Sequence, residues 1–450
     1  MKKRVLAIAM ILNAAMMGNN IHAQSGLKEI INYSLEHSRD IKKSELQCRE
    51  AEYLRKETIA NGLPQISATG TYSQMMFEKI EIPESLTSMI PAEYQDMVTP
   101  LLDQINGLDR LYSVSAGATV TQLIYSQAYI EGLKTTKKTM ELYSLLKTKS
   151  EEDVIAEVAT SYYQTGSMML QLETLDKSIR NLKEVYRIAE LTYKNDLLKE
   201  SSVNRLKVTI TNLEVTRKTL QDGIAIQMNY IKALAGMPAD TTITIDVTPM
   251  VNNDMALKRP SDFSINNVPS YQALLKQDEL YGQQVKLARA KYFPTLAAFD
   301  KLSYSSYSLE NDFDRFNHVN TLGLSLSVPI FTSGANHYKV KQNILKQAQL
   351  REDINKTKDL LTVGYNNASL EYQSACDLLV VQKENRELAQ KVYDQTALQY
   401  NEGMASMADL LNVNSDFLQA DNSYNQQVLK CKTAEIKMLK ASGNMKSILE

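Results

Sequence analysis

The sequence predicts a mainly α-helical fold combined with transmembrane-type β-strands, and three observations support that prediction. Two stretches of roughly 65 residues carry apolar residues at helical spacing. Four shorter segments alternate apolar residues with small polar ones. Both kinds of segment occur twice along the chain, so a strand-and-long-helix unit is duplicated.

The duplication is visible in short matching segments that stand at nearly constant distances. Residues 60–66 (ANGLPQI) correspond to residues 290–296 (AKYFPTL), an offset of 230. The matches between Leu123–Ser126 and Pro329–Thr332, and between Ala189–Tyr193 and Thr396–Tyr400, have offsets of 206 and about 207. We therefore divide the chain into a signal peptide, a first repeat, a linker and a second repeat, over residues 1–23, 24–236, 237–269 and 270–450.

The amino-terminal segment has the features of a secretory signal peptide. Three basic residues precede an apolar run, and a small-residue cleavage site ends at Ala23. Without Lys2, Lys3 and Arg4, the formal net charge of −2 becomes −5. This mildly acidic balance argues against nucleic acid as a partner. No later apolar run reaches the roughly 18 residues of a membrane-spanning helix, so a membrane role must come from strands or from surface contact.

The helical pattern is most regular in two stretches without proline, from Gln127 to about Lys194 and from Ala335 to about Tyr400. A helix of roughly 65 residues would be about 100 Å long. Shorter helices are expected over Leu27–Ala60, Ser201–Ala235, Ser270–Lys291 and Met407–Ala441. The chain is therefore predicted to consist largely of long helices packed side by side.

The alternating segments are expected to form two β-hairpins, over residues 64–125 and 294–331. Their length and their pairing of an apolar with a small polar face are typical of transmembrane barrel strands. In the third segment, Phe299 and Asp300 fall out of phase. An ordinary half-buried antiparallel sheet remains the alternative. The linker holds one short alternating run, Thr241–Asp246, which is expected to be a small strand packed on the helices.

Four strands cannot close a barrel, and an open edge in lipid would leave backbone groups unpaired. Two copies of the chain would supply eight strands around a plugged interior, whereas three would supply twelve around a water-filled lumen. A homotrimer is therefore expected for a conduit in outer-membrane lipid. The connection Phe77–Leu111, with a helix-capable stretch Tyr94–Ile105, would lie outside the barrel and cover its mouth.

Catalytic and metal-binding motifs are not evident, so we expect no enzyme, no cofactor and no metal site. His37, His318 and His337 lack metal-like spacing with cysteines or acids. The 19 methionines are scattered over apolar helix positions, which favours core packing over soft-metal transport. Three cysteines, Cys48, Cys376 and Cys431, are expected to be buried or free thiols rather than a disulfide framework.

Taken in order, these segments resemble the TolC family of trimeric outer-membrane efflux and secretion channels. The resemblance covers nearly the whole mature chain. It depends on the start of the first helix, on the residues at three strand ends and on a helix-turn-helix segment in the second repeat. These segments are Leu27–Ile30, Gly62–Gln65, Tyr292–Thr295, Val328–Phe331, Tyr400–Gly403 and Met407–Leu411.

The resemblance implies a twelve-stranded trimeric barrel that continues into a periplasmic tunnel of long helices. It also implies two partners, a periplasmic adaptor and an inner-membrane transporter. The expected function is a passive exit duct of a tripartite efflux or type I secretion system, in the outer membrane with a long periplasmic extension. The alternative is a periplasmic coiled-coil adaptor or structural protein with a soluble sheet.

The family's gating residues map onto the helix turn of the second repeat. Asp409 matches the first of two constriction acids, and Tyr400 matches a tyrosine that bonds to a neighbouring protomer. Asn412 stands where the second acid would be, and Ser202 where the acid that receives the tyrosine would be. Ala405 replaces the arginine that ties the closed tip. Opening is expected to untwist the helices at Gly403, whose counterpart in the first repeat is Asp196.

Asp409 has two interpretations that do not need the family. Three copies on a threefold axis would form a negatively charged ring that favours cations. The other interpretation is an acid at a helix N-terminus, stabilised by the helix dipole.

Overall fold

The computed structural model describes residues 26–76, 81–105, 110–251 and 263–449. The predicted signal peptide, residues 1–23, and part of the linker lie outside these ranges. The chain forms two compact units, one of residues 1–49, 141–277 and 349–450, the other of residues 50–140 and 278–348. The first is the helical unit and the second contains the strands.

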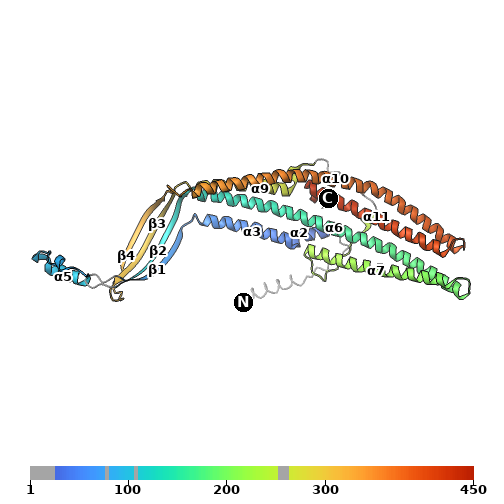
Figure 1. The fold of residues 1–450 in the computed structure, drawn as a ribbon, viewed down its shortest axis with the longest axis horizontal. Helices are drawn as coiled ribbons and strands as arrows, with labels where there is room; N and C mark the ends of the chain where they lie inside the picture. Colours follow the sequence, from blue (N-terminus) through green and yellow to red (C-terminus); the bar gives the residue numbers. More distant parts are fainter. Residues whose placement is uncertain (1–25, 77–80, 106–109, 252–262, 450) are drawn as a thin grey trace, which may run out of the picture. The chain divides into compact units, whose positions relative to one another are not determined.

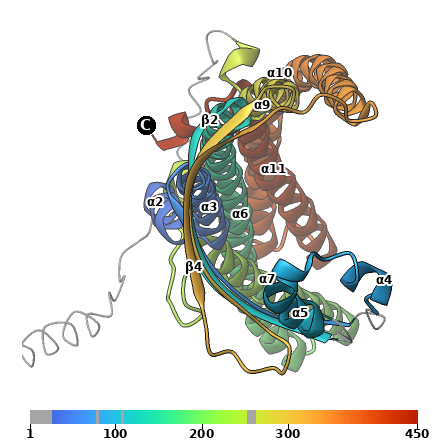
Figure 2. The same ribbon diagram turned by 90° about the vertical axis from the view of Figure 1, so that its left-hand side faces the viewer.

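The strand unit holds a four-stranded antiparallel sheet in the order β1-β2-β3-β4. The strands are β1 (Gln65–Met76), β2 (Arg110–Ser126), β3 (Thr295–Ser308) and β4 (Asn317–Ser327). They bend together as one curved sheet (Figures 1 and 2). The two predicted hairpins are present, although the second ends at Ser327, before the predicted limit of 331. Pro329 lacks the backbone N–H that a continuing ladder requires.

Neither face of the outer strands is covered by the described chain. On the apolar face, Ile66 of β1 and Leu322 and Leu324 of β4 are 76%, 81% and 70% exposed. The alternating small polar residues Ser67 and Thr321, on the opposite face, are exposed as well. An ordinary half-buried sheet would cover one of these faces, so that alternative does not describe this structure.

The strand register explains the irregularity in β3. Phe299 pairs with Gly323 on the small-polar face, where a side chain at Gly323 would come within 2.8 Å of the phenyl ring. Asp300 pairs with Val120 on one side and Leu322 on the other, so its carboxylate shares the apolar face. A glycine thus accommodates the aromatic residue, while an acid interrupts the apolar surface.

The connection between β1 and β2 contains two helices in its described part, α4 (Glu84–Thr87) and α5 (Ala92–Ile105). The second corresponds to the predicted helix-capable stretch and includes Pro100. The expectation that this connection covers a barrel mouth stays a prediction.

Two helical hairpins dominate the helical unit, and they use the two longest helices of the described chain. Helix α6 (Gln127–Lys194) is followed by α7 (Glu200–Ala235), and α10 (Ala335–Asn401) is followed by α11 (Met407–Ser442). The two long helices contain 68 and 67 residues. None of the described helices is long and apolar enough to cross a membrane. Figure 1 shows the two hairpins in green and in orange to red.

The predicted helix Leu27–Ala60 is wrong as a single element, because the chain turns at Ser38. It forms α2 (Leu27–His37) and α3 (Arg39–Ala60). The break accommodates Gly236, the left-handed cap of α7, where a side chain would lie 2.4 Å from the carbonyl oxygen of His37.

The second repeat reproduces that close approach at equivalent positions. Gly443 caps α11 with φ 71°, and a side chain there would lie 2.5 Å from the carbonyl oxygen of Asn267. Here the counterpart of α2 is a single 3₁₀ turn, η1 (Ile265–Asn267), before α9 (Pro269–Ala290). The duplication therefore extends to the helix caps, where only glycine combines a positive φ with contact to a neighbouring backbone.

The predicted strand Thr241–Asp246 is reduced to one β-bridge residue, Ile245, although the segment packs on the helices as expected. Ile243 and Ile245 are buried in a core that also contains Ile155 of α6 and Ile231 of α7. At the next residue, the Tyr162 hydroxyl donates to the Asp246 carbonyl at 3.0 Å and accepts the Asp246 N–H at 3.1 Å. A side chain therefore satisfies backbone groups that a strand would have paired.

The linker and the chain end complete the helical unit. The first described part of the linker, residues 237–251, ends in a short helix, α8 (Thr248–Val251), whose Met250 is buried beside Gly166 of α6. A final 3₁₀ helix, η2 (Met445–Leu449), places Met445 in the same core as the isoleucines.

Candidate functional site

The two helix turns of the helical unit have the same backbone geometry. Asp196 (φ 59°) and Gly403 (φ 76°) occupy equivalent left-handed positions. The Leu197 N–H donates to the Thr192 carbonyl at 3.1 Å, and the equivalent bond from Met404 to Gln399 measures 2.8 Å. These are Schellman-type helix ends. Asp196 adopts its conformation without being glycine, as short polar residues can.

The turns differ in how the following helix begins. At α11, Ser406 and Asp409 form a capping box: the Asp409 N–H donates to Ser406 Oγ at 3.1 Å, and the Ser406 N–H donates to Asp409 Oδ2 at 3.1 Å. At α7 the equivalent cap is Lys199, whose side chain makes no capping bond. This box was not predicted from the sequence, although its Ser-x-x-Asp spacing resembles the usual signature.

The capping box fixes the position of the predicted constriction acid. Ser406 Oγ donates to Asp409 Oδ2 at 2.6 Å, and this bond lowers the pKa of the exposed Asp409 carboxyl. Asp409 therefore acts as a helix N-terminal acid within one chain, which agrees with the second of its two interpretations. The predicted ring of three copies is a property of an assembly and stays a prediction.

The remaining predicted gating residues lie on both turns. Tyr400 is half-buried where two apolar clusters meet, one around Leu206 and Met407 and the other around Leu410. Burial raises the pKa of the Tyr400 hydroxyl.

The other positions are less enclosed. Ser202 lies on the first turn of α7 and is half-buried, whereas Asn412 is exposed on α11. No hydrogen bond joins Tyr400 to Ser202 within the described chain. The structure thus brings Tyr400, Gly403 and Asp409 together on one turn and leaves Ser202 on the other.

A line of polar side chains on the buried face of α11 was not predicted from the sequence. Ser178 Oγ of α6 donates to Asn414 Oδ1 at 2.8 Å. Further along, Asp421 accepts from Arg386 of α10 at 2.6 Å and from Asn425 at 2.9 Å. The signal was the recurrence of Asn and Asp on one helical face, spaced by seven and four residues. Such buried, paired groups favour one helix register over others.

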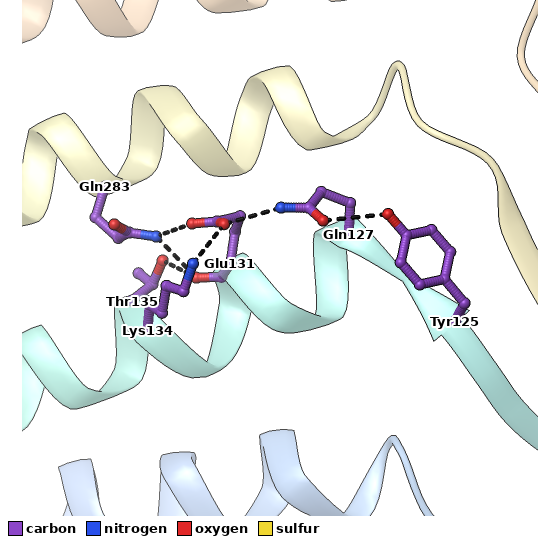
Figure 3. Close-up of polar contacts among 6 residues, drawn as sticks. All are labelled: Tyr125, Gln127, Glu131, Lys134, Thr135 and Gln283. Atoms are coloured by element: carbon purple, nitrogen blue, oxygen red, sulfur yellow. Dashed lines mark hydrogen bonds and ion pairs between the residues drawn. The ribbon is translucent and has the colours of Figure 1, made fainter.

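A second polar network lies beside the sheet, at the start of α6 (Figure 3). The buried carboxylate of Glu131 accepts from Gln283 of α9 at 2.5 Å, from Lys134 at 2.8 Å and from Gln127 at 3.0 Å. Tyr125, at the end of β2, donates in turn to Gln127 at 3.3 Å. The Lys134 bond lowers the pKa of Glu131, against the effect of burial. The network joins α6 and α9 where the chain leaves the strand.

The sequence is similar to a family model and to curated outer-membrane proteins. Residues 264–444 match the family model described as outer membrane efflux protein. Among curated relatives, the cation efflux system protein CusC of Escherichia coli O157:H7 is 22% identical over 336 residues, and the match covers 72% of this chain and 65% of CusC. The outer membrane protein TolC of E. coli K12 is 24% identical over 363 residues, covering 72% and 70%.

The solved structures agree on the fold. The outer membrane protein VceC of Vibrio cholerae superimposes with a TM-score of 0.68 at 14% identity, over 93% of this chain and 96% of VceC. The predicted fold class is therefore confirmed: this chain has the fold of VceC, with a small antiparallel sheet and long helices. The match of residues 264–444 to the outer membrane efflux protein model confirms the predicted resemblance.

Proposed function

We propose that three copies of this chain assemble into a passive exit duct across the outer membrane, within a tripartite efflux or type I secretion system. The observation that supports this most directly is the sheet. Its outer strands are open on both faces, and β1 and β4 each have one edge without a neighbouring strand within the described chain. A surface with one apolar and one small-polar face suits lipid on one side and water on the other.

Closure of the sheet explains the number of copies. If β4 of one copy pairs with β1 of the next, every edge is satisfied, as a membrane requires. Eight strands from two copies would enclose side chains only, whereas twelve from three would surround a water-filled lumen. A duct therefore favours three copies.

Apolar stripes on two helices point to the same assembly. Val208, Val215 and Ile226 of α7 are 60%, 62% and 69% exposed. Helix α10 has a longer stripe at spacings of three, seven and eight residues: Leu360, Val363, Leu370, Leu378, Val381 and Leu388. These spacings are those of a coiled-coil seam. Neighbouring copies would cover these stripes, which a free chain leaves in water.

The duct would be driven by partners, namely a periplasmic adaptor and an inner-membrane transporter. The family match and the name of CusC, a component of a cation efflux system, support this part of the proposal. The two equivalent turns at Asp196 and Gly403 would form the periplasmic tip. Opening there would separate the helical hairpins, with Tyr400, Ser202 and Asn412 as candidate gating residues.

Membrane fractionation combined with chemical crosslinking tests the assembly. The expected result is an outer-membrane fraction containing a crosslinked trimer that requires detergent and shows steady conductance in planar bilayers. A soluble monomer that crosslinks only to itself would contradict the channel and favour the periplasmic adaptor alternative.

The role of Asp409 needs a separate test. Asp409→Asn keeps an oxygen acceptor for the capping box but removes the charge, so cation selectivity or block by multivalent cations should change if three copies form a ring. Asp416→Asn removes a charge from an exposed position further along α11 and serves as the control. Unchanged recordings for Asp409→Asn would limit this residue to helix capping.

A further inference from the structure

Two of the three cysteines meet between the helices of the second hairpin. Cys376 of α10 and Cys431 of α11 place their Sγ atoms 2.8 Å apart. That separation is longer than the roughly 2.05 Å of a disulfide bond and shorter than an ordinary contact between two thiols, so the two side chains point at one another. Cys431 is 1% exposed in an apolar cluster with Tyr372 and Ala375, and Cys376 is half-buried at its border.

The contact lies within a well-defined helix register. On one side, Arg386 of α10 binds Asp421 of α11 at 2.6 Å, and on the other, Glu371 of α10 binds Lys437 of α11 at 2.9 Å. The two cysteines lie between these ion pairs, at matching distances from the α10–α11 turn. The hairpin therefore positions both sulfur atoms through contacts on either side of them.

We propose that Cys376 and Cys431 form a disulfide bond in the exported protein, tying α10 to α11 in the second repeat only. Export places the chain in a compartment where disulfides form and persist. The equivalent positions in the first repeat are Met169 and Ile224, which cannot form such a bond. Under the proposed function, the bond would resist sliding within one helical hairpin at the tip and leave the other free.

The chemistry follows from the exposure of the two thiols. Cys376 is the more accessible, so its thiolate attacks one sulfur of an oxidant disulfide, such as oxidised glutathione, and the oxidant's other sulfur leaves as a thiolate. Burial raises the pKa of the Cys431 thiol, so Cys431 reacts second. It releases its proton and attacks Cys376 Sγ, which expels the remaining oxidant sulfur. Two protein thiols are oxidised, and one oxidant disulfide is reduced to two thiols.

Thiol counting on the purified full-length protein tests the proposal. The protein is treated with reductant or with oxidised glutathione under native conditions, denatured, and labelled with a maleimide polymer that shifts its migration on a gel. The reduced chain should carry three labels, and the oxidised chain one, on Cys48. Cys376→Ser should keep two labels after either treatment, whereas Cys431→Ser leaves the glutathione on Cys376 in place and should keep one label after oxidation. Peptide mapping of the unsubstituted protein should recover the Cys376–Cys431 link, which avoids dependence on how the variants fold.

Three labels after oxidation, or a mapped link that includes Cys48, would overturn the proposal. If a chelator restores maleimide labelling of Cys376 and Cys431 and a reductant does not, the two thiols bind a soft metal ion, and this result would also overturn the proposal. The measurement needs no channel activity. A soluble monomer with a mapped disulfide would therefore contradict the proposed duct only, and a conducting trimer with three free thiols would contradict the disulfide only.

Discussion

At the scale of single residues, the main determinant of the helical unit is whether buried polar groups find partners. The Tyr162 hydroxyl pairs with both backbone groups of Asp246 and thereby holds the linker against α6. Burial raises the pKa of Tyr162 to about 12, so the hydroxyl keeps its proton at neutral pH. The neighbouring Tyr163 is half-buried and packs against Lys432.

Replacing Tyr162 should therefore weaken the attachment of the linker. Tyr162→Phe leaves two backbone groups of Asp246 without their partner, and we expect a loss of about 1 to 3 kcal/mol in the free energy of unfolding. Tyr163→Phe is the matched control and should cost less. Denaturant unfolding followed by circular dichroism measures both. Equal losses for the two variants would show that the hydroxyl does not secure the linker.

Glu152 of α6 gives a pH dependence with a defined sign. The residue is 7% exposed, and burial, with the charge of Asp153, raises the pKa of its carboxyl to about 7. Between the ordinary value near 4.5 and about 7, the unfolded chain ionises while the folded chain keeps the proton. The free energy of unfolding is therefore not reduced by Glu152 at low pH, and it falls as the pH rises through this window.

Glu152→Gln should remove this loss, because glutamine stays neutral. The variant and the original protein should have similar unfolding free energies near pH 4, and the variant should be more stable near pH 8 by about 1 to 3 kcal/mol. Glu173→Gln, a substitution on the exposed part of the same helix, is the control. A variant that is less stable at pH 8 would show that ionised Glu152 has a favourable partner.

At the scale of elements, the apolar face of the sheet contains one charged residue. Asp300 lies on the apolar face between Val120 and Leu322, whereas the next residue, Lys301, lies on the small-polar face opposite Thr321. If the apolar face contacts lipid, the Asp300 carboxylate reduces the stability of the assembled sheet, and Lys301 in the lumen does not.

Asp300→Leu should therefore raise the temperature at which the detergent-solubilised assembly dissociates, because an apolar side chain replaces a charge at the lipid face. Lys301→Leu, one residue away on the opposite face, should not raise it. Heat-modifiability on semi-native gels compares the two variants. A lower dissociation temperature for Asp300→Leu would indicate that the acid has a polar partner in the assembly.

At the scale of the whole molecule, one chain leaves apolar surface exposed on α10, which neighbouring copies would cover in the proposed trimer. Val381 belongs to the exposed stripe of α10, while Lys383, two residues later, is an exposed polar position. Val381→Glu should reduce the crosslinked trimer at least tenfold, because it places a charge in the seam. Lys383→Glu changes the net charge more and should preserve the trimer. Equal trimer yields would remove the α10 stripe from the proposed interface.

The sequence by itself determined the duplication, the long helices, the four strands and the positions of both helix turns. Each depends on a local pattern: helical periodicity, strict alternation, or turn residues such as those at Asp196 and Gly403. The resemblance to outer-membrane channels followed from the order of these patterns.

Only the tertiary structure decided features that depend on groups distant in sequence. The break at Ser38 responds to Gly236, the Tyr162 hydroxyl pairs with the linker backbone at Asp246, and Cys376 meets Cys431 across a hairpin. Periodicity along one segment cannot report which neighbour it will meet, because packing and hydrogen-bond satisfaction are set across elements.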